Sequence, residues 1–127
     1  GARARGEAQH QGSYEPIMQQ LRTLDVGHIT MEFTTPGVGE MSVLGQLPEH
    51  VKIGLGVVST LPGEVDSPET IVARVEQALQ HVAPERIVLN PECGFAPGSA
   101  AKVDVDEVYT KLKNEVAAAK MLRAKYE

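Results

Sequence analysis

The feature that most constrains the fold is an alternation between segments with helical spacing of apolar residues and short β-prone runs. Such an alternation favours a parallel sheet whose strands are joined by right-handed helical crossovers. The sequence predicts helical segments at 13–24, 41–47, 68–82 and 104–126, and strands at 27–33, 51–59 and 84–90. We therefore expect an α/β fold of about three β/α units.

Local signals refine two of the predicted helices. Ser67 and Pro68 form an N-cap and first-turn pair, and the final helix is expected to start at Asp104 or Asp106. The run 51–59 is almost wholly apolar residues and glycine, which is typical of a strand buried on both faces. The expected apolar faces are Ile71, Val72, Val75, Ala78, Leu79 and Val82 on one helix, and Val108, Leu112, Val116, Ala119 and Leu122 on the other.

Composition excludes several classes of protein. The net charge of −5 argues against a nucleic-acid surface, and no apolar run approaches the ~20 residues of a membrane span. With one cysteine among 127 residues no intrachain disulfide can form, so a reducing, cytoplasmic location is expected. Residues 1–12 are expected to be a flexible segment, and residues 13–127 a single domain.

Functional groups of parallel α/β folds lie at the carboxyl ends of the strands. That rule selects Glu32, Ser59 with Thr60, and the segment 90–93, which contains Cys93. A carboxylate and a thiolate at neighbouring strand ends are two of the ligands that zinc prefers. Alternatively, Cys93 is an inert core thiol and Glu32 a salt-bridged or half-exposed strand residue.

The segment "NPECGF" at 90–95 resembles the "NPDCGL" signature of the cobalamin-independent methionine synthase family. The segments "IMQQLRTLDVGHITMEF", "VKIGLGVVSTLPGEVDSPETIVARVEQAL" and "KLKNEVAAAKMLRAKY" follow the order expected in that family. The resemblance extends from about Gly12 to the end of the chain.

This resemblance implies the C-terminal part of a (β/α)8 TIM-type barrel with zinc at the carboxyl ends of its strands. It assigns Glu32 and Cys93 to two of the family's metal ligands. The implied reaction is methyl transfer from methyltetrahydrofolate to the thiol of homocysteine, giving methionine. Substrate contacts are expected from Ser59 and Asp66, which lie on the functional side of the sheet.

The family's H-x-C ligand pair should precede "GSYEP", where "GARARGEAQHQG" stands instead. If "ARARG" occupies the place of the motif, Ala2 and Ala4 replace two metal ligands. His10 has the wrong spacing for a ligand, and His28, His50 and His81 are expected to be structural or surface residues. The chain alone is therefore expected to bind zinc weakly and to be inactive.

Two alternatives stay open: a zinc-dependent alkyltransferase acting on another thiol such as coenzyme M, and a non-catalytic subunit or remnant. In either case three strands covered by helices on one side leave two open edges and, we expect, an apolar inner face. The sequence therefore predicts association with the rest of a barrel or with a second copy.

Overall fold

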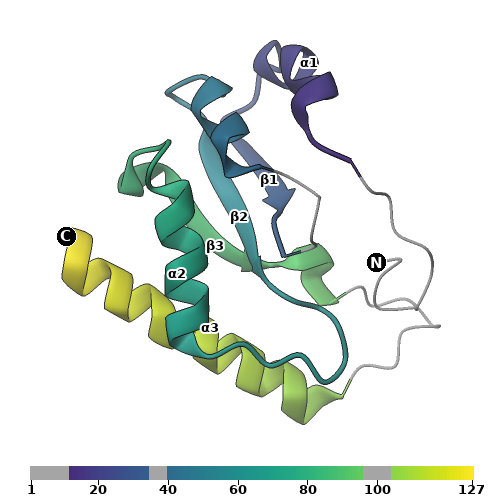
Figure 1. Ribbon diagram of the computed structural model, residues 1–127, viewed down its shortest axis with the longest axis vertical. Helices are drawn as coiled ribbons and strands as arrows, with labels where there is room; N and C mark the ends of the chain where they lie inside the picture. Colours follow the sequence, from purple (N-terminus) through teal and green to yellow (C-terminus); the bar gives the residue numbers. More distant parts are fainter. Residues whose placement is uncertain (1–11, 35–39, 96–103) are drawn as a thin grey trace.

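A computed structural model of the chain describes residues 12–34, 40–95 and 104–127. Its centre is a parallel sheet of β1 (His28–Glu32), β2 (Lys52–Val58) and β3 (Ile87–Pro91), in the order β1-β2-β3. Helices α2 (Pro68–Ala78) and α3 (Val105–Tyr126) pack against one another and against β2 and β3 respectively (Figure 1). The predicted α/β class and all three predicted strands are confirmed.

The remaining helical segments are short. The predicted helix at 13–24 divides into the 3-10 turn η2 (Glu15–Ile17) and α1 (Met18–Arg22). The predicted turns at 41–47 form the 3-10 helix η3 (Met41–Gln46), and the 3-10 turns η4 (Pro84–Arg86) and η5 (Glu92–Phe95) flank β3. The helical segment η3, described between β1 and β2, thus has 6 residues, against 11 in α2 and 22 in α3.

Both long helices begin at the residues that the sequence indicates. The Ser67 hydroxyl accepts the N–H of Thr70 at 3.2 Å, with Pro68 in the first turn of α2. The Asp104 carboxylate accepts the N–H groups of Asp106 and Glu107, so Asp104 is the N-cap of α3. These side chains satisfy backbone donors that have no partner within the helix.

The core lies between the sheet and the helices. Every residue of β2 from Ile53 to Val58 is buried, as expected for a central parallel strand. The predicted apolar face of α2 is confirmed, because Ile71, Val75 and Ala78 are each at most 2% exposed. This packing fixes α2 over the middle of the sheet.

The predicted inward face of α3 is partly wrong. Leu112 and Val116 are 41% and 56% exposed, whereas Lys111 and Ala118 are buried. The physical reason is the orientation of α3, which places Ala118 in the core. On the same helix, the buried Lys111 Nζ donates a hydrogen bond to the Leu61 carbonyl oxygen at 2.6 Å. Val116 therefore remains uncovered.

The expected apolar inner face of the sheet is also wrong. A methyl group built on Gly54 would meet Thr30 Oγ1, His28 Nε2 and Asn90 Oδ1 at 2.6 to 2.9 Å. Polar side chains therefore surround the central glycine on that face, opposite the apolar core. No helix of the described residues is both long and apolar enough to cross a lipid bilayer.

Candidate functional site

Two of the side chains predicted to share a site are in direct contact. Glu32 is the last residue of β1, and Cys93 follows β3 in η5. The Cys93 Sγ donates a hydrogen bond to Glu32 Oε1 although 61 residues separate them in sequence. The structure thus brings a thiol and a carboxylate together at the carboxyl ends of the strands.

Gly56 of the intervening strand permits this approach. In register it pairs with Glu32 on one side and Asn90 on the other. A methyl group at this position would lie 2.8 Å from the Met31 carbonyl oxygen and 3.2 Å from Glu32 Cα. Any larger residue here would force the end of β1 to move.

The backbone at Cys93 is unusual for a residue with a side chain. Its φ is +46°, and Gly94 and Phe95 follow at +52° and +62°. Left-handed backbone costs free energy at a non-glycine residue, and such conformations cluster at functional sites. The turn directs the exposed Cys93 side chain toward Glu32 rather than into the core.

The thiol is strongly biased toward its protonated form. Partial burial of the sulfur, followed by its hydrogen bond to Glu32 and the charge of that carboxylate, raises the pKa of Cys93 to about 11. In this state the proton lies between the two side chains. A cation that replaced it would meet one sulfur and one oxygen donor.

Tyr14 supports the same strand end and was not identified from the sequence. Its hydroxyl accepts the N–H of Glu32 at 2.9 Å and donates to the Glu32 carbonyl at 3.1 Å. Its ring packs on Phe33, with centroids 5.7 Å apart. Burial and the nearby Glu32 carboxylate raise the pKa of Tyr14, although its hydrogen bond to the backbone opposes the shift. Only the fold brings this residue to β1, so no local sequence signal could have revealed it.

Glu92 lies in the segment 90–93 that the strand-end rule selects, but no role was assigned to it from the sequence. It is 3% exposed and accepts the Thr34 N–H at 2.7 Å, which ties η5 to the segment that follows β1. Its position directly before Cys93 in "NPECGF" was a sequence signal for a role at the same strand end. A carboxylate buried there requires specific hydrogen-bond partners.

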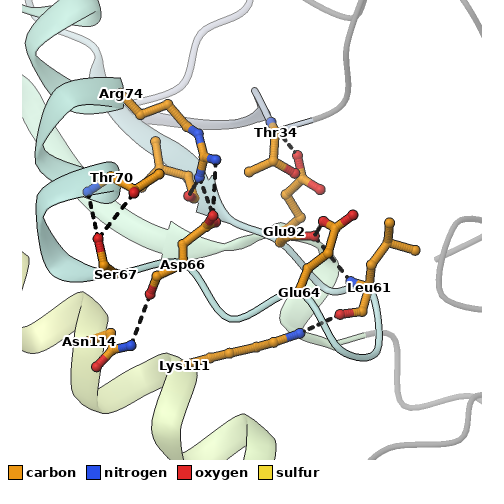
Figure 2. Close-up of polar contacts among 12 residues, drawn as sticks. Thr34, Leu61, Glu64, Asp66, Ser67, Thr70, Arg74, Glu92, Lys111 and Asn114 are labelled. Atoms are coloured by element: carbon orange, nitrogen blue, oxygen red, sulfur yellow. Dashed lines mark hydrogen bonds and ion pairs between the residues drawn. The ribbon is translucent and has the colours of Figure 1, made fainter.

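Ser59 and Asp66, the predicted substrate contacts, lie in the loop from β2 to α2. Figure 2 shows Asp66 facing Arg74, whose guanidinium donates to both carboxylate oxygens at 2.8 and 3.3 Å. Ser59 donates to Glu64 at 2.7 Å and accepts the Leu61 N–H. Both side chains therefore have structural bonds within the loop, and a substrate role for them stays a prediction.

Contacts with α3 hold this loop in place. The buried Lys111 donates to the Leu61 carbonyl and pairs with Glu107 at 2.9 Å, while Glu107 accepts the Gly63 N–H at 3.0 Å. The Asn114 side chain donates to the Asp66 carbonyl at 2.9 Å (Figure 2). The loop beside the strand ends is thus bonded at several points to a long helix.

The donor set fits part of a zinc site. Thiolate and carboxylate are both zinc ligands, but a catalytic zinc normally has three protein ligands. No group of three or more His, Cys, Asp or Glu suited to a metal occurs within 12–34, 40–95 and 104–127. Ala2, Ala4 and His10 lie outside the described residues, and His28, His50 and His81 are exposed, as expected.

Comparison with known proteins gives consistent similarities. Residues 10–121 match the family model described as "Cobalamin-independent synthase, Catalytic domain". The chain is 31% identical over 113 residues to a Bacillus licheniformis 5-methyltetrahydropteroyltriglutamate–homocysteine methyltransferase, and 29% identical over 115 residues to a Pyrococcus horikoshii methionine synthase. These matches include 89% and 91% of this chain, but only 14% and 32% of the two relatives.

A solved structure shares the fold. The B12-independent methionine synthase from Shewanella, in complex with selenomethionine, superposes with a TM-score of 0.76 at 19% identity. The match covers 88% of this chain and 31% of that one. The described sheet and helices therefore correspond to about a third of a larger known fold.

Proposed function

This chain belongs to the cobalamin-independent methionine synthase family, whose catalytic-domain model matches residues 10–121, and we propose that it forms the C-terminal part of a methyl-transferring (β/α)8 barrel. The proposed reaction is methyl transfer from methyltetrahydropteroylglutamate to the thiol of homocysteine, in the cytoplasm. Support for the partial barrel comes from the parallel order of β1, β2 and β3 and from the share of the Shewanella structure that is matched. Residues 13–127 are its proposed extent.

The observation that carries the proposal is the contact between Cys93 Sγ and Glu32 Oε1. We propose these two atoms as zinc ligands, with further donors from outside the described residues. When bound, zinc supplies the Lewis acidity that keeps a coordinated substrate thiol deprotonated and nucleophilic near neutral pH.

The chain's own residues would orient these donors. Tyr14 fixes the backbone of Glu32 through two hydrogen bonds, and Glu92 links η5 to the segment after β1. Gly56 leaves room for the backbone at the end of β1 and for the Glu92 side chain. Ser59 and Asp66, on the loop held by α3, are proposed to form the wall of the substrate site beside the strand ends.

A non-catalytic remnant is the second candidate, and the absence of a third metal ligand among the described residues favours it. Transfer to a different thiol, such as coenzyme M, would use the same donors. The experiment measures zinc content and methyl transfer for the chain alone and for the chain combined with the Pyrococcus horikoshii methionine synthase from which the 115 residues matching this chain have been removed.

We expect weak, substoichiometric zinc and no activity for the chain alone, and about one zinc with methyl transfer for the assembly. Replacing Cys93→Ser should abolish both, whereas Glu49→Gln, an exposed change elsewhere, should not. A folded assembly that holds no zinc would support the remnant. Activity with coenzyme M but not homocysteine would identify the other acceptor.

A further inference from the structure

The loop between β2 and α2 contains a tight turn at 61–64, the segment "LPGE". The N–H of Glu64 donates to the Leu61 carbonyl at 3.2 Å, and Gly63 has a φ of +81°. Proline at the second position and a glycine with positive φ at the third are typical of a type II turn. The turn therefore has a defined local shape, and its place beside the sheet is set by the groups that contact it.

An ion pair on α3 contacts two backbone groups of this turn. Lys111 Nζ donates to the Leu61 carbonyl oxygen at 2.6 Å (Figure 2). The same ammonium lies 2.9 Å from Glu107 Oε1, and the Glu107 carboxylate accepts the Gly63 N–H at 3.0 Å. One end of the pair thus holds an acceptor of the turn, and the other end holds a donor two residues later.

The stability of the domain gives little reason for this lysine. Lys111 is 2% exposed, and the attraction within a buried ion pair often fails to offset the cost of removing an ammonium from water. If an uncharged side chain replaced it, the Leu61 carbonyl would keep the Glu64 N–H. Glu107, at 23% exposure, would keep the Gly63 N–H and water. The ion pair is therefore better explained by the position that it gives the turn.

One of the two side chains predicted to contact substrate depends on this turn. Ser59 donates to the Glu64 carboxylate at 2.7 Å, at the end of the turn that Lys111 holds. The Asp66 carbonyl has an anchor of its own, because it accepts the side-chain N–H of Asn114 at 2.9 Å. Release of the turn from Lys111 would therefore loosen Ser59 more than Asp66.

We propose that Lys111 is a positioning residue of the methyl-transfer site: it holds the turn at 61–64, and through Glu64 the hydroxyl of Ser59, where they bound the site of a homocysteine-like thiol acceptor. The inference rests on the proposed function, because it takes the acceptor to bind at the strand ends beside this loop. Lys111 itself is buried and acts only through the turn. A loop that is already ordered binds its ligand at a smaller entropic cost, so release of the turn weakens acceptor binding more than it slows the chemical step.

The test compares two variants of Lys111 with a control on the same helix. Lys111→Met nearly keeps the length of the side chain and removes its charge, and Lys111→Arg keeps a cation. Lys113→Met is the matched control, since Lys113 is exposed. Amide hydrogen exchange at Gly63 and Glu64 and urea unfolding are measured on the whole chain alone. The kcat and the KM for homocysteine are measured with the shortened Pyrococcus horikoshii methionine synthase as the rest of the barrel.

We expect Lys111→Met to accelerate exchange at Gly63 and Glu64 at least about tenfold while the urea midpoint stays unchanged or rises. In the assembly it should raise the KM for homocysteine about tenfold and change kcat less than about threefold. Lys111→Arg should stay closer to the unchanged chain, and Lys113→Met should match it.

Exchange at the turn that is equally slow in Lys111→Met and Lys113→Met would overturn the proposal. So would faster exchange throughout β2 together with a lower urea midpoint, because that result assigns Lys111 to the stability of the whole domain. An unchanged assembly without methyl transfer would refute the proposed function, and with it any role of Lys111 in the reaction. The exchange measurement needs no turnover, so it decides separately whether Lys111 holds the turn.

Discussion

Cys93 and Glu32 are in contact across the width of the sheet, with Gly56 of the central strand between them. Glu32 lies at the end of β1 and Cys93 follows β3. These two strands do not pair with each other, since each pairs with β2. The contact therefore depends on the lack of a side chain at Gly56 and on the left-handed turn at Cys93.

Gly56→Ala should destabilise the chain by about 1–3 kcal/mol, because the new methyl group would overlap backbone atoms of β1. Urea unfolding measures this loss. Gly27→Ala is the control, since a methyl group there has no atom within 4 Å. Equal stability of the two variants would show that the strands adjust without cost.

Cys93 should react fully with a maleimide in the absence of denaturant, because its side chain is exposed. The reaction should be slower than that of an unstructured peptide thiol, since partial burial of the sulfur and then the hydrogen bond to Glu32 both favour the protonated thiol and raise the pKa of Cys93. Mass spectrometry follows the labelling, Cys93→Ser controls for its site, and added zinc should slow it. A thiol that reacts only after unfolding would restore the core-thiol interpretation.

Tyr14→Phe should cost about 1–2 kcal/mol of stability, because the Glu32 N–H and C=O both lose the Tyr14 hydroxyl as a partner. The variant should also accelerate amide hydrogen exchange more at Glu32 than at residues of β2. Tyr109→Phe, at a 70% exposed position, should change neither measurement. Unchanged exchange at Glu32 would show that water replaces the hydroxyl without loosening the strand.

Glu107→Gln should reduce stability at pH 7, and the reduction should become smaller as the pH is lowered towards 3. The hydrogen bond from Lys111, and then that from the Gly63 N–H, lower the pKa of Glu107 in the folded chain. A lowered folded-state pKa adds stability above the unfolded-state value of about 4.3, and this stability is lost as the pH falls through the folded value. Urea unfolding at both pH values tests whether the stabilities of Glu107→Gln and of the unchanged chain approach one another at low pH, with Glu49→Gln as the control.

Much of the secondary structure follows from local sequence. Helix α2 is recognisable because Ser67, Pro68 and the 3.6-residue apolar spacing lie within a few turns of one another. Strand β2 is recognisable because its apolar run is continuous. Placing Glu32 and Cys93 at strand ends required only the predicted ends of the strands at 27–33 and 84–90, and the rule that parallel strands point the same way.

The sequence by itself therefore determined the alternating elements, their caps and the edge of the sheet where the thiol and carboxylate lie. Only the tertiary structure decided that these two side chains touch, that Tyr14 and Glu92 hold them, and that Lys111 rather than Leu112 is buried on α3. The physical reason is the range of the interactions. Helix caps and apolar periodicity act between neighbours in sequence, whereas burial and hydrogen bonding of these side chains depend on segments that meet only after the sheet has formed.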